Sequence, residues 1–164
     1  MKNAQNDFAA EGGGTEIFMA ILNIIKEGDE TLRKISRPVT EITPRILTLL
    51  DDMKDTMHHA DGCGLAAVQV GVLRRIVIVE VEPGVLYELI NPRIVAFAGE
   101  QREEEGCLSL PGKQGRTKRP YAVTVRALNR HGEEIEVSGQ GLLARAFCHE
   151  IDHLDGKLYI DRLV

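Results

Sequence analysis

Long apolar runs are missing from this chain, since no hydrophobic stretch reaches the length needed to cross a bilayer, and we place no part of it in a membrane. Basic residues are not in excess: the net charge is −5 without a dense lysine and arginine stripe, which argues against nucleic acid as a partner. Its short basic stretch, GRTKRP at residues 115–120, reads first as a loop. Cysteine is scarce and odd in number, with three in 164 residues, so we expect no disulfide framework but a reducing cytoplasm with free or metal-bound thiols.

Internal repeats and low-complexity linkers are also absent, and the length fits one domain with a real hydrophobic core. Residues 1–18 are polar and glycine-rich and lack the charged start and long apolar centre of a signal peptide. We expect them to be a disordered leader or an artificial extension outside the fold. Hydrophobic patterning begins at Met19, so residues 19–164 are expected to form the single domain.

Two segments have helical periodicity. The first is expected to begin at Thr43, a suitable N-cap, with Pro44 in the first helical position and apolar residues at spacings of three and four as far as Met57. The second is LLARAFCHEIDHL, residues 142–154, ended by a glycine. Between them strands are predicted at residues 75–81, 85–92, 93–99, 121–128 and 133–137, whereas residues 103–120 read as irregular and polar.

The last helix carries the sequence HEIDH, an HExxH pattern. His149 and His153 lie four residues apart, so they share one helix face and can hold one metal ion. Glu150 lies beside that face, where a base that activates water belongs. The alternative is a chance helix with two histidines, but the preceding turn, with Leu142, Arg145 and Ala146, is mostly apolar and does not resemble a solvated surface helix. The order of elements then predicts an α+β fold: mixed or antiparallel β-sheets packed around a C-terminal metal-binding helix, with a second long helix near the N-terminus.

The third ligand must come from elsewhere in the chain, because no histidine follows His153. Asp155 and Asp161 are the carboxylates downstream of it, and neither is attractive: one sits at the expected helix cap and the other follows an apolar run. Cys107 lies upstream in a segment that could run beside the helix. A thiolate with two imidazoles would leave the fourth position of a metal open for water. The adjacent pair His58 and His59 do not share a helix face, and we do not expect them to be ligands.

Three motifs in order, GCGLAAVQVG (62–71), EGCLSL (105–110) and HEIDHLDG (149–156), resemble the signature motifs of the peptide deformylases. This resemblance implies a single catalytic metallohydrolase domain that removes the formyl group from formylmethionyl nascent polypeptides in a bacterial cytoplasm, with transient ribosome contact. It implies metal ligation by Cys107, His149 and His153, with Fe(II) as the physiological ion and Zn(II), Ni(II) or Co(II) able to substitute. It further implies Glu150 as general acid and base, and an oxyanion site formed by the Gln69 side chain and the backbone N–H of Leu108.

Substrate contacts are expected on both sides of this centre. Gly62 and Gly64 would let the backbone approach a bound peptide closely, and Gly106 is also expected to contact the substrate. Leu142 and Ala146 offer an apolar wall suited to an unbranched methionine. Arg145 is expected to line the pocket with its stem and to reach peptide carbonyls or a carboxylate at the rim, although a solvent-facing arginine is an equal alternative.

Other interpretations stay open at this stage. A zincin-like metallopeptidase would need a third ligand other than Cys107. A non-catalytic metal-stabilised module would close the fourth position with a side chain such as Cys148, which we otherwise expect to pack as a small buried residue. Gln69 could merely cap a turn. Asp152 is expected to point away from the metal, with Arg119 as its candidate partner.

Overall fold

The computed structural model describes residues 20–164, so the expectation for residues 1–18 lies outside the described part of the chain. None of the helices in residues 20–164 is both long and apolar enough to span a membrane. The helices are α1 (Pro44–His59) and α2 (Leu142–Leu154), with short 3-10 turns η1 (Glu30–Arg33), η2 (Ala67–Val70) and η3 (Tyr159–Arg162). The strands are β1 (Gly64–Ala66), β2 (Ile76–Val79), β3 (Tyr87–Ala98), β4 (Gln101–Cys107), β5 (Leu110–Arg119), β6 (Ala122–Leu128) and β7 (Glu134–Gln140).

Two antiparallel sheets organise the fold. The larger has the strand order β1-β2-β3-β6-β7, and the smaller is the β4–β5 hairpin. Every pair of neighbouring strands named here runs antiparallel. The predicted α+β class is therefore confirmed, and of the two sheet types expected the antiparallel one is found.

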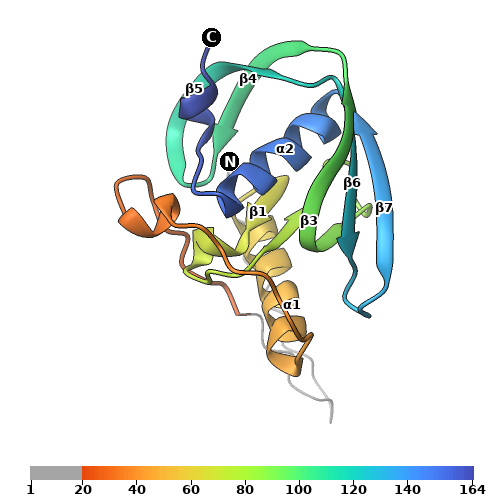
Figure 1. Ribbon diagram of the computed structural model, residues 1–164. Coiled ribbons are helices and arrows are strands. Elements are labelled where there is room, and N and C mark those ends of the chain that lie inside the picture. The colour runs from red at the N-terminus through yellow and green to blue at the C-terminus, as the bar shows by residue number, and fades with distance from the viewer. Residues whose placement is uncertain (1–19) are drawn as a thin grey trace.

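The two helices pack on opposite faces of the larger sheet, and strand β2 shows why. Its four residues are all buried, because successive side chains of a strand point to opposite faces. Val77 and Val79 pack in the cluster that contains Phe147 of α2, whereas Ile76 and Ile78 pack in the cluster around α1. Figure 1 shows α2 enclosed between the sheet and the β4–β5 hairpin.

Helix α1 begins where the sequence predicts. The Thr43 side chain accepts a hydrogen bond from the backbone N–H of Ile46, and Pro44 occupies the first helical position. Thr43 thereby satisfies one of the N–H groups that a helix leaves without a partner at its start. The apolar stripe of α1 then fixes its buried face against the sheet.

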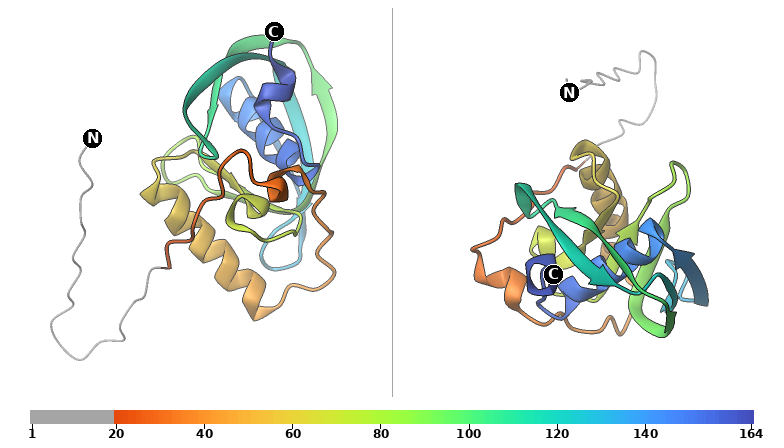
Figure 2. Two further views of the ribbon diagram at one scale, coloured as in Figure 1. Left: turned by 90° about the vertical axis from the view of Figure 1, so that its left-hand side faces the viewer. Right: turned by 90° about the horizontal axis from the view of Figure 1, so that it is seen from above.

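The segment read as irregular, residues 103–120, is largely the β4–β5 hairpin, and the reading of GRTKRP as a loop was wrong. Most residues of this hairpin are exposed, so it lacks the apolar alternation of a half-buried strand. Its buried residues are largely polar, among them Glu105, Thr117 and Arg119. The hairpin crosses over α2 beside the C-terminal residues, as the view from above in Figure 2 shows. A polar interior explains why the sequence pattern missed it.

The two predicted strands at residues 85–92 and 93–99 merge into the single strand β3. Asn91 adopts a left-handed φ of 52° at a register shift next to Pro92. A local irregularity of this kind accommodates a proline, which cannot donate to a regular ladder. The Asn91 side chain also bonds the backbone N–H and C=O of Val39, which holds the bulge in place.

Candidate metal centre

Cys107, His149 and His153 meet in space although the first histidine lies 42 positions after the cysteine in the sequence. One donor atom from each lies within 4.8 Å of the other two. Sγ of Cys107 is 3.4 Å from Nε2 of His153, and the two imidazole rings have centroids 5.1 Å apart. In residues 20–164 this is the one group of three or more such side chains that could hold a metal ion.

Local structure explains this convergence. His149 and His153 lie one turn apart on α2, and both are buried. Cys107 is the last residue of β4, which reaches the helix because the hairpin folds over it. The sequence placed the two histidines by their spacing, whereas the approach of the cysteine depends on the tertiary fold.

The donor set fits a divalent transition metal. One thiolate and two imidazoles are a set that Zn(II), Fe(II), Co(II) and Ni(II) accept. Burial lowers the pKa of His153 well below its usual value, so its imidazole is neutral and carries a lone pair. Burial also disfavours the charged form of His149, but hydrogen bonds with Cys107 and Glu105 outweigh it and raise its pKa to about 10. His153 is therefore already in the neutral form that a metal ion requires, whereas a metal ion at His149 would displace a proton.

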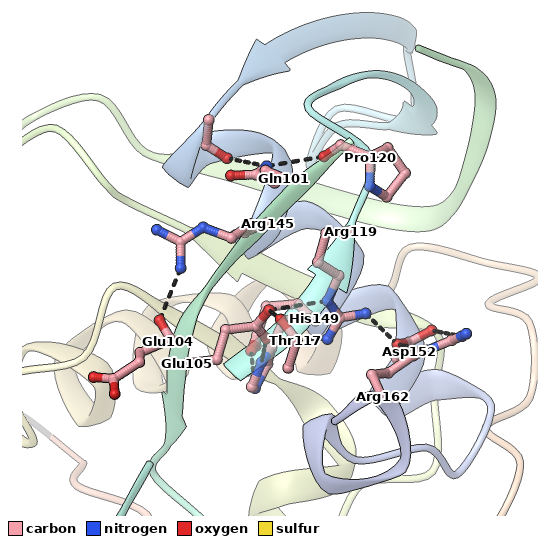
Figure 3. A network of polar contacts seen from close by, with 12 residues as sticks. Gln101, Glu104, Glu105, Thr117, Arg119, Pro120, Arg145, His149, Asp152 and Arg162 are labelled. Atoms are coloured by element: carbon pink, nitrogen blue, oxygen red, sulfur yellow. Dashed lines mark hydrogen bonds and ion pairs between the residues drawn. The ribbon is translucent and has the colours of Figure 1, made fainter. Parts of the chain in front are cut away.

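A buried polar network supports His149 from behind (Figure 3). Nδ1 of His149 donates to Oε1 of Glu105 at 2.9 Å, and Thr117 donates a short hydrogen bond to the same carboxylate. Arg119 donates from Nε and Nη2 to the two Glu105 oxygens, at 3.0 Å each. Burial alone would raise the pKa of Glu105, but the bonds from His149 and Arg119 lower it to about 2. Glu105 is therefore an ionised acceptor that orients the imidazole.

Glu150 lies next to the three donors and is almost entirely buried. Its Oε1 is 3.6 Å from Nε2 of His149, and its Oε2 is a buried oxygen without a hydrogen-bond partner. Burial raises the pKa of this carboxyl to about 7. Gly64 makes room for it, because a Cβ at that position would lie 2.9 Å from Cγ of Glu150. A carboxylate with an unpartnered oxygen and a pKa near neutrality is suited to proton transfer.

Gln69 is buried next to Cys107 and is not among the residues that line the cleft. Its Oε1 accepts a hydrogen bond from the backbone N–H of Ala66, so it does cap the turn at η2. That bond fixes the orientation of the amide, and Nε2 then faces Oγ of Ser109 at 3.1 Å and Sγ of Cys107 at 3.5 Å. The Gln69 amide therefore caps the turn with its oxygen and contacts Cys107 with its nitrogen.

A cleft of about 600 Å³ opens over the cluster. One wall is the segment that leads into β1, and the other is the end of β4 with the first turns of α2. Of the eleven residues predicted to be catalytic, substrate-binding or metal-binding, nine line this cleft, and the other two, Gln69 and His153, are buried and do not line it. The nine are Gly64, Gly106, Cys107, Leu108, Leu142, Arg145, Ala146, His149 and Glu150.

Arg145 is partly buried, and Nη1 donates to the backbone carbonyl of Glu104 at 2.9 Å (Figure 3). The guanidinium therefore reaches a peptide carbonyl, but one that belongs to β4 of this chain. Leu142 is 48% exposed at the mouth of the cleft, while Ala146 is buried deeper in it. This wall is apolar with a single cation at its rim.

Three other side chains lie where the sequence predicted. Cys148 is buried and outside the metal-binding group, and burial raises the pKa of its thiol to about 11. His58 pairs with Glu80 at 2.8 Å instead of joining the cluster. Asp152 pairs with Arg119 at 2.6 Å, as predicted.

The functional residues that sequence reasoning missed are the supports, Glu105 above all. A signal for it existed: Glu105 precedes Cys107 by two positions, and alternate residues of a strand face the same side. That signal could be used only if residues 103–107 had been recognised as a strand. Cys63 also lines the cleft.

Comparison with known proteins shows which family this chain resembles. The family model for polypeptide deformylase matches residues 21–164. A peptide deformylase of Acetivibrio thermocellus is 58% identical over 146 residues, which are 89% of this chain and 85% of that protein. One of Thermoanaerobacter pseudethanolicus is also 58% identical, over 89% of this chain and 91% of that protein.

Solved structures are similar as well. The crystal structure of a peptide deformylase from Legionella pneumophila matches with a TM-score of 0.86 and 45% identity, over 88% of this chain and 87% of that one. The structure of the peptide deformylase from Thermotoga maritima matches with a TM-score of 0.85 and 38% identity, over 88% of this chain and 98% of that one. Sequence and fold therefore agree over nearly all of the described residues.

Proposed function

The chain belongs to the polypeptide deformylase family, and we propose that it hydrolyses the N-terminal formyl group of formylmethionyl nascent polypeptides, with release of formate, at the Cys107 centre. The observation that carries this proposal is the convergence of Cys107, His149 and His153 under a cleft that also contains Glu150. Nucleophilic water, a proton carrier and room for a peptide are what hydrolysis of an amide requires.

Cys107, His149 and His153 would hold one divalent ion. Such an ion, when bound, lowers the pKa of water toward neutrality and polarises a carbonyl oxygen. We propose Fe(II) as the physiological ion, with Zn(II), Ni(II) or Co(II) able to substitute, because a thiolate with two imidazoles accepts each of them. Glu105 would hold His149 in the tautomer that leaves its Nε2 lone pair free, since Nδ1 donates to the Glu105 carboxylate.

Glu150 would carry the proton. As a carboxylate it takes a proton from the attacking water, and it then delivers this proton to the departing amine nitrogen of methionine. A neutral amide cannot release its nitrogen without that proton. The burial that raises the pKa of Glu150 to about 7 supports both halves of this transfer, since the group gains and loses a proton readily near neutral pH.

Gln69 and Leu108 would stabilise the negative charge that develops on the formyl oxygen. The amide nitrogen of Gln69 is fixed on the side of the cluster because its oxygen is held by Ala66. Nε2 lies 3.1 Å from Oγ of Ser109 and 3.5 Å from Sγ of Cys107, and its N–H on the sulfur side would donate to a substrate oxygen bound there. Leu108 follows Cys107 directly and lines the cleft, so its backbone N–H is the second candidate donor.

The substrate would lie in the cleft between Gly64 and Gly106. Without side chains at these positions, its backbone can pass close to both walls. The methionine side chain would pack against the apolar wall of Leu142 and Ala146. Arg145 would act at the rim, where its bond to the Glu104 carbonyl braces the edge of β4 and leaves its stem against the pocket.

A zincin-like metallopeptidase is the weaker reading of the same helix. It needs a third ligand other than Cys107, and both downstream carboxylates are engaged in ion pairs. Asp155 pairs with Arg75 at 3.0 Å, and Asp161 pairs with Arg33. We therefore favour the deformylase reaction, carried out in the bacterial cytoplasm on chains that leave the ribosome, with transient ribosome contact.

The proposal is tested by an anaerobic assay of formate release from formyl-Met-Ala-Ser, with metal analysis on the same sample. We expect formate release in proportion to the metal content. Cleavage of internal peptide bonds without formate release, by protein that contains one metal ion per chain, would contradict the proposal.

A further inference from the structure

The C-terminal residues are tied to the helix that carries both histidines. Arg162 donates from Nε to Oδ2 of Asp152 at 3.1 Å and from Nη2 to Oδ1 at 3.0 Å. Asp152 directly precedes His153 on α2. The Arg162 contact is therefore a two-bond clamp on the residue next to a candidate ligand (Figure 3).

The clamp continues through Arg119 to the other two candidate ligands. Arg119 donates from Nη1 to Asp152 and from Nε and Nη2 to Glu105, and Glu105 accepts from His149. Glu105 also stands two residues before Cys107 on β4. A single chain of charged contacts therefore spans from the C-terminal segment to both elements that supply the three donors.

Arg162 is needed to balance the charges in this series of contacts. Arg119 is the guanidinium shared by two largely buried carboxylates, Glu105 and Asp152, which leaves one negative charge in excess. Arg162 supplies the second positive charge. Without it, Glu105 and Asp152 would compete for Arg119, and Arg119 would be drawn toward Asp152 and away from the Glu105 carboxylate that orients His149.

The backbone holds Arg162 in position. Leu163 forms a bridge with Thr117 of β5, and the N–H of Val164 donates to the Arg116 carbonyl at 3.0 Å. The Leu163 side chain packs where a Cβ on Gly115 would lie, 2.4 Å from its Cδ2, so the absence of a side chain there admits it. The segment that carries Arg162 thus extends the edge of the hairpin.

We propose that Arg162 is a positioning residue for the metal centre, acting through Asp152, Arg119 and Glu105 on His149. This inference rests on the proposed function, since it requires that Cys107 and the two histidines bind a metal ion. Removal of an outer-shell partner typically costs ~10–100-fold in metal affinity, and Arg162 lies three contacts beyond Glu105, so the expected effect is toward the low end, about tenfold.

The test compares Arg162→Gln with Arg162→Lys and with Arg126→Gln as a matched control. Arg126 is also 40% exposed and also uses Nε and Nη2 to hold a carboxylate, that of Glu136, but on the β6–β7 pair. Each protein is loaded with Co(II) under anaerobic conditions. The visible absorption of the bound ion reports its ligand geometry, and the rate of its loss to excess EDTA reports how firmly it is held.

We expect Arg162→Gln to change the Co(II) spectrum and to accelerate metal loss about tenfold, with partial rescue by Arg162→Lys, which keeps the charge but not the planar fork that binds both carboxylate oxygens. Arg126→Gln should match the unchanged chain in both readouts. A general loss of stability would lower the melting temperature without altering the spectrum at 25 °C. If the unchanged chain binds Co(II) and Arg162→Gln leaves spectrum and rate unaltered, this inference fails alone; if the unchanged chain binds no metal, the proposed centre fails with it.

Discussion

Nδ1 of His149 donates a hydrogen bond to Oε1 of Glu105 across the gap between helix α2 and strand β4. This contact joins the element that carries two candidate ligands to the element that carries the third. The same Glu105 carboxylate also pairs with the buried guanidinium of Arg119. Loss of the Glu105 charge should therefore lower both the metal affinity of the centre and the free energy of unfolding.

Glu105→Gln should lower metal affinity by ~10–100-fold, because a neutral amide holds the imidazole of His149 less firmly than a carboxylate does. It should also lower the free energy of unfolding by about 3 kcal/mol, because Arg119 loses a buried ionic partner. Chelator competition and urea denaturation measure the two effects. Glu136→Gln is the control, since this exposed partner of Arg126 should cost about 1 kcal/mol or less and leave metal affinity unchanged. Equal metal affinity in the two variants would remove Glu105 from the support of the site.

Cys107→Ser should abolish stoichiometric metal binding, because a neutral hydroxyl replaces the thiolate of a three-donor site. Cys148→Ala is the matched control. The Cys148 thiol is buried in the hydrophobic core and lies outside the metal-binding group, so this variant should keep one metal ion per chain. Metal content after gel filtration under anaerobic conditions is the measurement. Full occupancy in Cys107→Ser would favour the zincin-like reading over the one proposed here.

Glu150→Gln should retain the metal and lose formate release by ~10²–10⁴-fold, the usual contribution of a positioned general acid and base. The substitution keeps the shape of a buried side chain, so the variant should fold. Rates with formyl-Met-Ala-Ser are compared at equal metal content. A variant that kept its metal and most of its activity would show that the proton travels by another group, and would leave a purely structural metal module as an explanation.

That Cys107, His149 and His153 lie together could be predicted from the sequence, because most of the pattern is local. Two histidines at a spacing of four on an amphipathic helix need no tertiary information, and α1 was predictable from Thr43, Pro44 and its apolar stripe. Cys107 was assigned by the exclusion of other ligands and by the order of three motifs. Each of these signals is a property of the amino-acid order alone.

The support of the site was less predictable, because it depends on a hairpin stabilised by polar contacts. Periodicity methods detect strands by alternating apolar residues, and β4 and β5 bury Glu105, Thr117 and Arg119 instead. The partnership of Arg162 with Asp152 needs the C-terminal residues to lie beside β5, which no local pattern encodes. Strand β3 was divided in two because Pro92 usually interrupts a strand.

Gln69→Ala should reduce kcat by ~10²–10³-fold, the cost of losing one donor to a developing oxyanion, while the metal stays bound. Gln101→Ala offers a matched control: its amide also donates to backbone oxygens, those of Pro120 and Gly141, but away from the cluster (Figure 3). That variant should lose stability and keep its kcat per bound metal. Normal turnover in Gln69→Ala would mean that Gln69 only caps the turn through its bond with Ala66 and takes no part in the reaction.

Gly64→Ala should inactivate the site without unfolding the chain. The added Cβ would lie 2.9 Å from Cγ of Glu150 and 3.0 Å from its Cδ, so the carboxylate must shift. A displacement near 1 Å of a catalytic group can cost about 10²-fold in rate, and we expect a loss of that size in kcat. Gly106→Ala separates this effect from crowding of the cleft in general, because its Cβ would meet nothing nearer than the Lys113 carbonyl at 3.5 Å. Its loss should be smaller and should appear in KM, since it lies against the peptide and not against Glu150. Equal losses of kcat in both variants would mean that crowding of the cleft, and not displacement of the Glu150 carboxylate, explains why glycine is required at position 64.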